Sequence, residues 1–250
     1  MADINKITDI DASTISKISD IDIADISKIG NDIIVPPPPP PPEPINTLLL
    51  IHSNTFNGST IFTDSARDHT ITPTNVTHNT SRYKFPPSSI SFPGSGTLAV
   101  QNSADWSFGS SDWTIESFVR RTTADSGYRL LWRTGGVNAV PGIFFGLNSG
   151  IIYFQATTGN DAIYADVDPL TPDVFYHIAA VRHGSNVYIY RNGTRATTLT
   201  PTNINTIFNR TEGPTIGEGF YGHFEEIRVS NIARYTESSY TIPTSEFSVD

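Results

Sequence analysis

The sequence of 250 residues contains no cysteine and only one methionine. Without cysteine the protein has no disulfide, no thiolate nucleophile and no thiolate metal ligand, so its stability has to come from buried apolar surface. No stretch approaches the roughly 18 consecutive apolar residues of a membrane-spanning helix, so we expect no membrane insertion. The N-terminus places Asp3 where a secretory signal has a basic region and an apolar core, so we expect no signal peptide.

Positive charge is also scarce in this chain. There are 16 Lys and Arg against 25 Asp and Glu, which gives a formal net charge of −9. This balance argues against nucleic acid as a partner, because binding to the phosphate backbone depends on basic side chains. The six histidines are scattered without metal-ligand spacing, and no nucleophile elbow is present. We therefore expect a protein that is not an enzyme.

The first 35 residues repeat an eleven-residue unit three times, with copies that begin at Ile4, Ile15 and Ile26. Each copy places isoleucine at its first, fourth and seventh positions, except that the third has Asp32 at the seventh and isoleucine at the eighth. One copy is too small to enclose its own isoleucines, so we predict that residues 1–35 anchor and oligomerise the chain. The expected partner-binding positions are Ile4, Ile7, Ile10, Ile15, Ile18, Ile21, Ile26, Ile29, Ile33 and Ile34.

Several conformations are compatible with this repeat. Eleven residues make three helical turns of about 3.67 residues, which would keep the isoleucines on one side of a helix. However, the Asp, Ser, Thr and Asn between them favour caps and turns, and isoleucine loses rotamer freedom in helices. We favour short strands or turns that pair with other chains. A disordered acidic leader is the alternative.

Residues 36–44 form a proline-rich linker with seven consecutive prolines, Pro36 to Pro42, followed by Pro44. At about 3.1 Å per residue, a polyproline II helix of this length is a spacer of roughly 20 to 25 Å. Residues 45–250 then alternate short apolar runs with turn signals, and the chain has 18 glycines and 18 prolines. About a dozen strands without intervening helices predict an all-β fold of two antiparallel sheets packed face to face.

The predicted strands are Thr47–Ile51, Ser89–Phe92, Gly96–Val100, Trp113–Arg120, Tyr128–Trp132, Ile143–Leu147, Ile151–Gln155, Ala162–Val167, Phe175–Arg182, Asn186–Arg191, Ala196–Leu199, Thr215–Gly217 and His223–Ser230. Asn192-Gly193 predicts a type I′ hairpin turn, and residues 231–235 give at most a helical turn. The alternation within Trp113–Arg120 predicts a half-buried central strand.

We expect the acidic and basic residues of the predicted strands to form structural salt bridges. Glu226 and Arg228 lie two apart on one strand face, so we expect them to pair with Arg182 or Glu116 on neighbouring strands. Glu225 and Glu226 are adjacent, which predicts that they face opposite sides of the sheet.

Three motifs occur in order along the predicted sandwich. They are Phe108-Gly109 followed by Asp112 to Val119; Tyr176 to Arg182 leading to Tyr188 to Gly193; and Ile216-Gly217 leading to Gly222 to Ser230. Together they resemble laminin-G-like, concanavalin-A-like jelly-roll domains over about Leu48 to Phe247. The Ile-rich repeat, proline linker and sandwich together resemble virion proteins of tailed bacteriophages.

The resemblance implies a head or tail fibre or decoration subunit on the virion exterior, made in the host cytoplasm. Its expected partners are capsid or tail proteins and further copies of itself, with a trimer preferred, and the sandwich is expected to bind host-surface glycan. The alternative is a purely structural spacer without a ligand. A glycan-degrading enzyme is disfavoured, because hydrolases of this fold carry Glu-x-Asp-x-x-Glu, which is absent.

Candidate sugar-binding residues are aromatics near predicted loops or strand ends, namely Tyr128, Trp132, Tyr164, Phe220 and Tyr221. Core positions are the alternative for each of them. The resemblance also implies calcium as the one expected cofactor, with Asp64 and Asp68 in an early loop and Glu225 where the family usually has Asp. The alternative is that these three are solvated loop carboxylates and a capped turn.

Overall fold

The computed structural model describes residues 45–122, 126–135, 142–156, 162–164, 168–199 and 212–250. The chain divides into two units, Met1–Pro42 and Glu43–Asp250, and the described residues belong to the second. The isoleucine repeat, with every predicted contact position from Ile4 to Ile34, and the proline linker lie outside the described residues.

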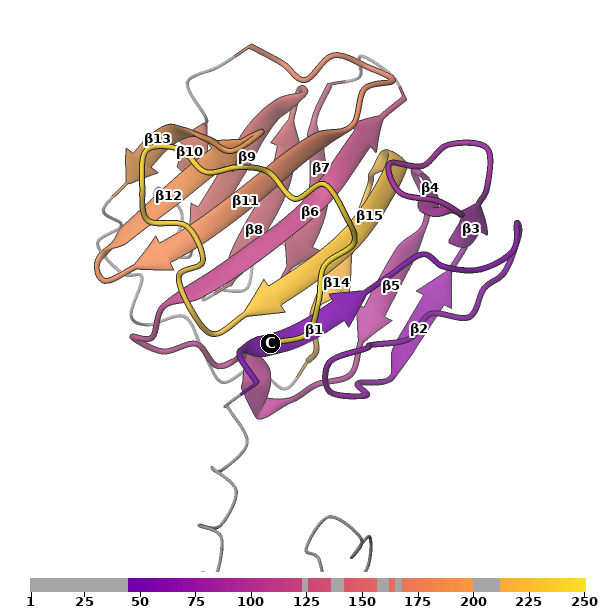
Figure 1. Cartoon of the computed structure of the whole chain (residues 1–250), viewed down its shortest axis with the longest axis horizontal. Helices are drawn as coiled ribbons and strands as arrows, with labels where there is room; N and C mark the ends of the chain where they lie inside the picture. The colour runs from indigo at the N-terminus through magenta and orange to yellow at the C-terminus, as the bar shows by residue number, and fades with distance from the viewer. Residues whose placement is uncertain (1–44, 123–125, 136–141, 157–161, 165–167, 200–211) are drawn as a thin grey trace, which may run out of the picture. The chain divides into compact units, whose positions relative to one another are not determined.

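The second unit is an antiparallel β-sandwich, as the sequence predicted (Figure 1). The strands of its eight-stranded sheet are β1 (Thr47–Ile51), β3 (Thr77–Asn79), β4 (Ser89–Pro93), β6 (Trp113–Arg121), β11 (Tyr176–His183), β12 (Asn186–Arg191), β13 (Thr194–Leu199) and β15 (Tyr221–Ser230). Their order is β13-β12-β11-β6-β15-β4-β3, and β1 also pairs with β15.

The second sheet has seven strands. They are β2 (Ile71–Thr74), β5 (Thr97–Val100), β7 (Tyr128–Arg133), β8 (Ile143–Asn148), β9 (Ile151–Ala156), β10 (Ala162–Tyr164) and β14 (Thr215–Ile216), in the order β10-β9-β8-β7-β14-β5-β2. A short 3-10 helix, η2 (Ala104–Trp106), precedes β6. Among the described residues, no helix has the length and hydropathy of a membrane span.

The inner faces of the two sheets form one apolar core. The rings of Trp113 on β6 and Phe154 on β9 stack with centroids 5.8 Å apart, which places side chains of the two sheets in direct contact. Isoleucine, valine and aromatic side chains dominate this cluster, as expected for residues that pack well on a pleated surface. Burial of this apolar surface is what stabilises a chain without disulfides.

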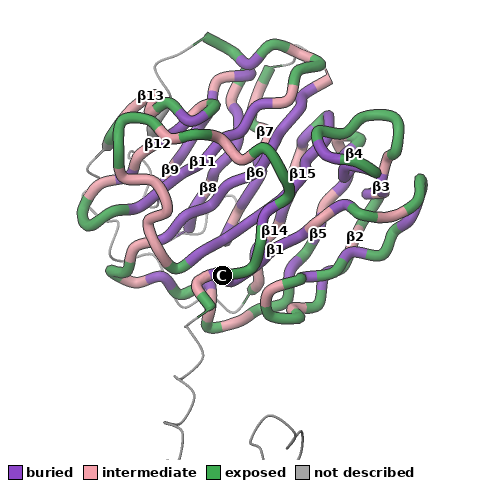
Figure 2. The backbone as a smooth tube through the Cα atoms, in the orientation of Figure 1, coloured by how far each residue is buried: buried purple, intermediate pink, exposed green. Residues whose placement is uncertain are grey.

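The C-terminal segment, residues 231–250, lies across the outer face of the eight-stranded sheet (Figure 1). Its backbone bonds to the β12–β13 turn through the Tyr240 N–H to the Gly193 carbonyl at 2.7 Å, and to β1 through the Thr47 N–H to the Asp250 carbonyl at 3.1 Å. Figure 2 shows buried strands beneath this segment, while the segment itself carries many of the exposed residues. The expectation of a half-buried β6 was therefore wrong, because both faces of that strand are covered.

Most predicted strands are present with ends within a few residues of the expected positions. The type I′ turn is confirmed, since φ is +47° at Asn192 and +77° at Gly193. β2 and β3 were not predicted, because they are short and rich in polar residues. Pro73 within β2 is tolerated because β2 is an edge strand. Residues 231–235 form bends without a helical turn.

Candidate functional site

The predicted sugar-binding aromatics divide into exposed and buried residues. Tyr128 and Tyr221 are 54% and 51% exposed, so their rings are available to a ligand. Trp132 and Phe220 are 0% and 1% exposed, and their prediction as sugar-binding residues was wrong. Tyr164 lies on β10, where its backbone pairs with Tyr153, and its side chain is outside the described structure.

Packing inside the sandwich explains why two of these aromatics are unavailable. The Trp132 ring meets Trp106 edge to face, with centroids 5.5 Å apart. The Phe220 ring packs on Phe224 at 4.1 Å between centroids. Both side chains belong to the main core, so their apolar surface contributes to stability and cannot present a face to a sugar.

The predicted calcium ligands have other partners. The buried Asp64 carboxylate accepts backbone N–H bonds from Leu50 at 3.0 Å and Ala66 at 2.9 Å, and it contacts the His69 ring at 2.7 Å. Asp68 is exposed in a turn with φ of +58°. The part of the chain that the structure describes contains no group of three or more His, Asp or Glu side chains able to hold a metal. The structure therefore does not bring Asp64, Asp68 and Glu225 together.

The third predicted ligand, Glu225, accepts hydrogen bonds from the backbone N–H groups of Lys84, at 2.5 Å, and Phe85, at 2.6 Å. Burial raises the pKa of Glu225 to about 7, although these two donors act in the opposite direction. Its neighbour Glu226 accepts from the Phe247 N–H at 2.7 Å. Phe85 and Phe247 belong to one small apolar cluster, so the two carboxylates lie on the same side of the sheet.

That arrangement corrects the prediction that Glu225 and Glu226 face opposite sides. The register of β15 against β6 shifts between Glu225 and Arg228, and Glu226 has φ of +57°. This irregularity is a β-bulge, which inserts one residue and re-aims the side chains that follow. Adjacent residues can therefore share a face only because the strand alternation is broken at this point.

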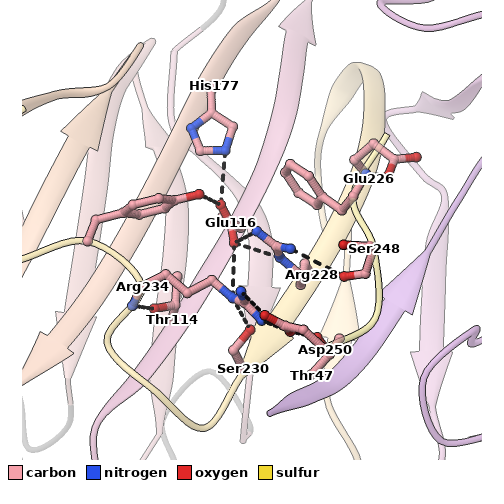
Figure 3. A network of polar contacts seen from close by, with 12 residues as sticks. Thr47, Thr114, Glu116, His177, Glu226, Arg228, Ser230, Arg234, Ser248 and Asp250 are labelled. Carbon is pink, nitrogen blue, oxygen red and sulfur yellow. Dashed lines mark hydrogen bonds and ion pairs between the residues drawn. The ribbon is translucent and has the colours of Figure 1, made fainter. Parts of the chain in front are cut away.

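Beneath the C-terminal segment, Glu116 is the centre of a buried polar network (Figure 3). Its carboxylate accepts from Arg228 Nε at 2.8 Å, from the Tyr235 hydroxyl at 2.8 Å and from His177 Nε2 at 3.1 Å. The predicted pairing of Arg228 with Glu116 is confirmed. Arg182 instead donates to the backbone carbonyls of Gly109 and Gly184.

The electrostatics of Glu116 follow from these contacts. Burial acts to raise the pKa of this carboxyl, but the His177 hydrogen bond and the Arg228 charge outweigh it and lower the pKa to about 2. An ionised carboxylate only accepts, so His177 Nε2 carries a proton and donates it. The network ties β6, β11, β15 and the C-terminal segment together, and its role is structural because Glu116 is inaccessible to solvent.

Where the C-terminal segment does not cover the sheet, the ends of β3, β4, β15 and β6 frame an open groove of about 620 Å³. The register places Ser91, His223 and Arg120 in one row across three strands. Side chains two residues apart share a face, so Tyr221 lies in the next row, beside Thr122. The Thr122 hydroxyl donates to the Tyr221 carbonyl at 3.2 Å, which confirms this neighbourhood.

The charged residues of the groove are Arg82, Arg120 and Asp173, and His223 lies among them. Arg120 pairs with Asp173 through Nη2 and with His223 Nδ1, at 3.2 Å, through Nη1. Burial and the nearby charges of Arg120 and Arg82 lower the pKa of His223 to about 4, so the imidazole is neutral at pH 7. Among the described lining residues, two guanidiniums stand against one carboxylate, which gives these residues one net positive charge.

Tyr221 was predicted as a sugar-binding residue, but the residues that line the groove were not. Arg120 and His223 belong to strands that were predicted, so their row would follow from the strand register once it is known. Arg82 and Asp173 come from loops, and no periodic pattern in the sequence points to them. Tyr128 is on the second sheet, with its ring against Tyr153 at 5.0 Å, and does not line the groove.

Comparison with known proteins relates the fold to a family. The family model described as the concanavalin A-like lectin/glucanases superfamily (Laminin_G_3) matches residues 92–238. No curated protein matches the sequence of the chain. Among solved structures, the binding domain of Paraclostridial Mosquitocidal Protein 1 is similar, with a TM-score of 0.59 and 15% identity over 76% of this chain and 50% of that chain.

Two botulinum neurotoxin structures are similar to the same extent. One is of type C, whose cell entry depends upon interaction with two ganglioside molecules, with 12% identity, a TM-score of 0.58, and coverage of 75% of this chain and 48% of that chain. The other is the binding domain of neurotoxin DC in complex with SialylT, with 11% identity, a TM-score of 0.57, and coverage of 75% and 48%. This chain spans about half the length of these structures, and the likeness shows a shared fold. The motifs, the sandwich and the match over more than half of its residues together show that the chain belongs to the concanavalin A-like lectin/glucanase superfamily.

Proposed function

We propose that this chain is a non-enzymatic structural protein of a tailed-phage virion, a head or tail fibre or decoration subunit that binds glycan on the host surface. The observation that carries the binding role is the open polar groove, together with the exposed Tyr221, which lies two residues from His223 along β15. Sugar sites combine an aromatic face with a few polar groups that fix the orientation of the hydroxyls. The groove supplies hydroxyl, amide, guanidinium and imidazole groups beside such a face.

The attachment role comes from the sequence of the first 44 residues. The isoleucine row needs a partner, for which we propose capsid or tail proteins and further copies of the chain, preferably in a trimer. The prolines would hold the sandwich away from the particle, on the virion exterior. Several copies on one particle multiply a weak sugar contact, because the second binding event becomes intramolecular.

The burial and hydrogen bonding of the acidic residues support a role without catalysis. Glycoside hydrolysis needs two carboxyl groups on either side of a bound sugar. Glu225 and Glu226 share a face, but each is 1% exposed, and their oxygens accept backbone N–H bonds. Glu116 is likewise buried beneath the C-terminal segment.

A glycan array probed with the full chain tests the binding role. We expect signals on bacterial surface glycans that are lost in Tyr221→Ala and kept in Tyr83→Ala, a similarly exposed tyrosine that lies outside β15. Silence across the array would contradict the binding role and support a spacer without a ligand.

Deletion of residues 1–35 tests the attachment role. We expect the truncated chain to stay out of purified virus particles, while the full chain is incorporated. Incorporation of both would contradict the anchor.

A further inference from the structure

The groove is rich in hydrogen-bond donors. Arg82 donates to the carbonyl of its neighbour Ser81 at 2.8 Å, and among the described residues no carboxylate pairs with its guanidinium. Asn79 uses its side-chain oxygen to accept the N–H groups of residues 81 and 82, which leaves its amide N–H₂ as the other polar group. The hydroxyl of Ser91 also lines the groove. Among the described residues that line the groove, Asp173 is the single carboxylate, and it is bound to Arg120.

The contact between Arg120 and His223 determines which histidine nitrogen carries the proton. A guanidinium has only donors, so His223 Nδ1 has to be the acceptor in their 3.2 Å contact. A neutral imidazole with an accepting Nδ1 has its proton on Nε2. The lowered pKa of His223, about 4, agrees with the neutral form. The imidazole therefore adds one more N–H donor, in an orientation fixed by Arg120.

The two arginines differ in how their charges are balanced. Arg120 is buried and held by Asp173 on one side and His223 on the other, so its charge is compensated and its position is fixed. Arg82 is exposed, and no carboxylate in the described part of the chain pairs with its charge. A ligand anion in this groove would therefore pair with Arg82, and a guanidinium matches a carboxylate with two parallel N–H···O bonds.

The charge of the whole chain determines how an anion would be held. A net charge of −9 gives no long-range attraction for anions, so an anionic group has to be held by short-range pairing with a local positive charge. Tyr221 lies two residues before His223 on β15, a distance of about 6.7 Å along the strand. Its exposed ring offers an apolar face next to the charged row. A sugar ring and the carboxylate that it carries would span this short distance.

We propose that the groove binds a saccharide bearing a carboxylate, with Arg82 pairing with the carboxylate, His223 Nε2 and Ser91 donating to the same group, and Tyr221 packing on the sugar ring. The ligand class rests on the proposed function, since a glycan adhesin is assumed. The pairing with Arg82 is the new element.

The test measures binding of the full chain to immobilised polygalacturonate, alginate and hyaluronate, each compared with its carboxyl-reduced form. Polyglycerol phosphate and neutral dextran complete the panel. We expect at least one carboxylated polymer to bind at least tenfold more tightly than its reduced form. Arg82→Gln should lose at least tenfold in affinity, which corresponds to about 1.4 kcal/mol.

Lys84→Gln is the matched control, because it also removes one positive charge and lies two residues from Arg82. The Lys84 side chain is exposed and does not line the groove. It should bind within about twofold of the wild type, since exposed charges act weakly through salt solution. Equal unfolding midpoints of the two variants would show that both fold, and Ser91→Ala should weaken binding independently.

The possible failures separate the inference from the proposed function. Equal binding by Arg82→Gln and the wild type would overturn the inference, as would tighter binding to polyglycerol phosphate than to any carboxylated polymer. Binding to dextran or to the reduced polymers alone would overturn the inference and leave the glycan-adhesion role in place. No binding to any polymer would count against both.

Discussion

The substitution Glu116→Gln tests whether the buried network holds the C-terminal segment on the sheet. The amide keeps the shape of the side chain but removes the charge that faces Arg228 and turns one acceptor oxygen into a donor. Arg228, Tyr235 and His177 all supply donors to this carboxylate, so at least one of them would lose its partner. Removing one member of a buried ion pair typically costs about 3–5 kcal/mol.

Urea unfolding of the full chain at pH 7 measures this cost. A thermal melt should show the same loss. For a domain of about 200 residues, 1 kcal/mol shifts the melting temperature by roughly 2–4 °C, so we expect Glu116→Gln to melt about 10 °C below the wild type. Glu237→Gln, at an exposed acid of the C-terminal segment, is the control and should leave stability unchanged. A cost below about 1 kcal/mol at position 116 would refute the structural role of the network.

The same substitution should have a characteristic pH dependence. The pKa of Glu116 falls from 4.5 to about 2 on folding, so its ionisation stabilises the fold above pH 4.5, and this stabilisation is lost as the pH falls to 2. The difference corresponds to about 3 kcal/mol. The gap in unfolding free energy between the wild type and Glu116→Gln should therefore shrink by about that amount between pH 5 and pH 2. A constant gap would contradict the assigned ionisation.

Three further predictions concern other residues. Trp132→Ala should lower the free energy of unfolding by about 3–5 kcal/mol in urea titration, because it empties a core position, whereas Tyr221→Ala should cost less than about 1 kcal/mol. Gly217→Ala should destabilise the sandwich by more than about 1 kcal/mol, because Gly217 has φ of +83° and an added Cβ would lie 2.0 Å from the Phe92 ring; an unchanged melting temperature would refute this. Asp64→Ala should lower the melting temperature, because the Asp64 oxygens accept backbone N–H bonds. Added calcium should leave the melting temperature of the wild type unchanged, because these oxygens already have partners; a rise with calcium would contradict this expectation.

Much of the sandwich could be predicted from the sequence because its strands carry alternating or continuous apolar residues bounded by turn signals. The turn at Asn192-Gly193 was predictable because its positive φ values require such residues. The cover over β6 was not, since residues 231–250 have no periodic pattern, and their position depends on tertiary contacts of Tyr235, Tyr240 and Phe247. Consequently, the polar side chains of β6 that looked solvent-facing are buried.

The candidate site was less predictable than the fold. The pairing of Arg228 with Glu116 followed from strand spacing, but the bulge at Glu226 depends on a single residue with positive φ and has no sequence signal of its own. The groove combines strand residues with loop residues that lie about 40 to 140 positions apart in the chain, such as Arg82, Arg120 and His223. Only the register of the folded sheet brings these side chains together.

The central claim is that a carboxylated saccharide binds in the groove at the end of the eight-stranded sheet. Amide chemical-shift mapping by NMR of the full chain, titrated with a carboxylated polymer that it binds, tests this claim most directly. We predict that the largest shifts occur at Arg82, Ser91, Tyr221 and His223, and that Tyr128 on the second sheet is unaffected. Shifts centred on Tyr128, with the groove residues unchanged, would contradict the claim.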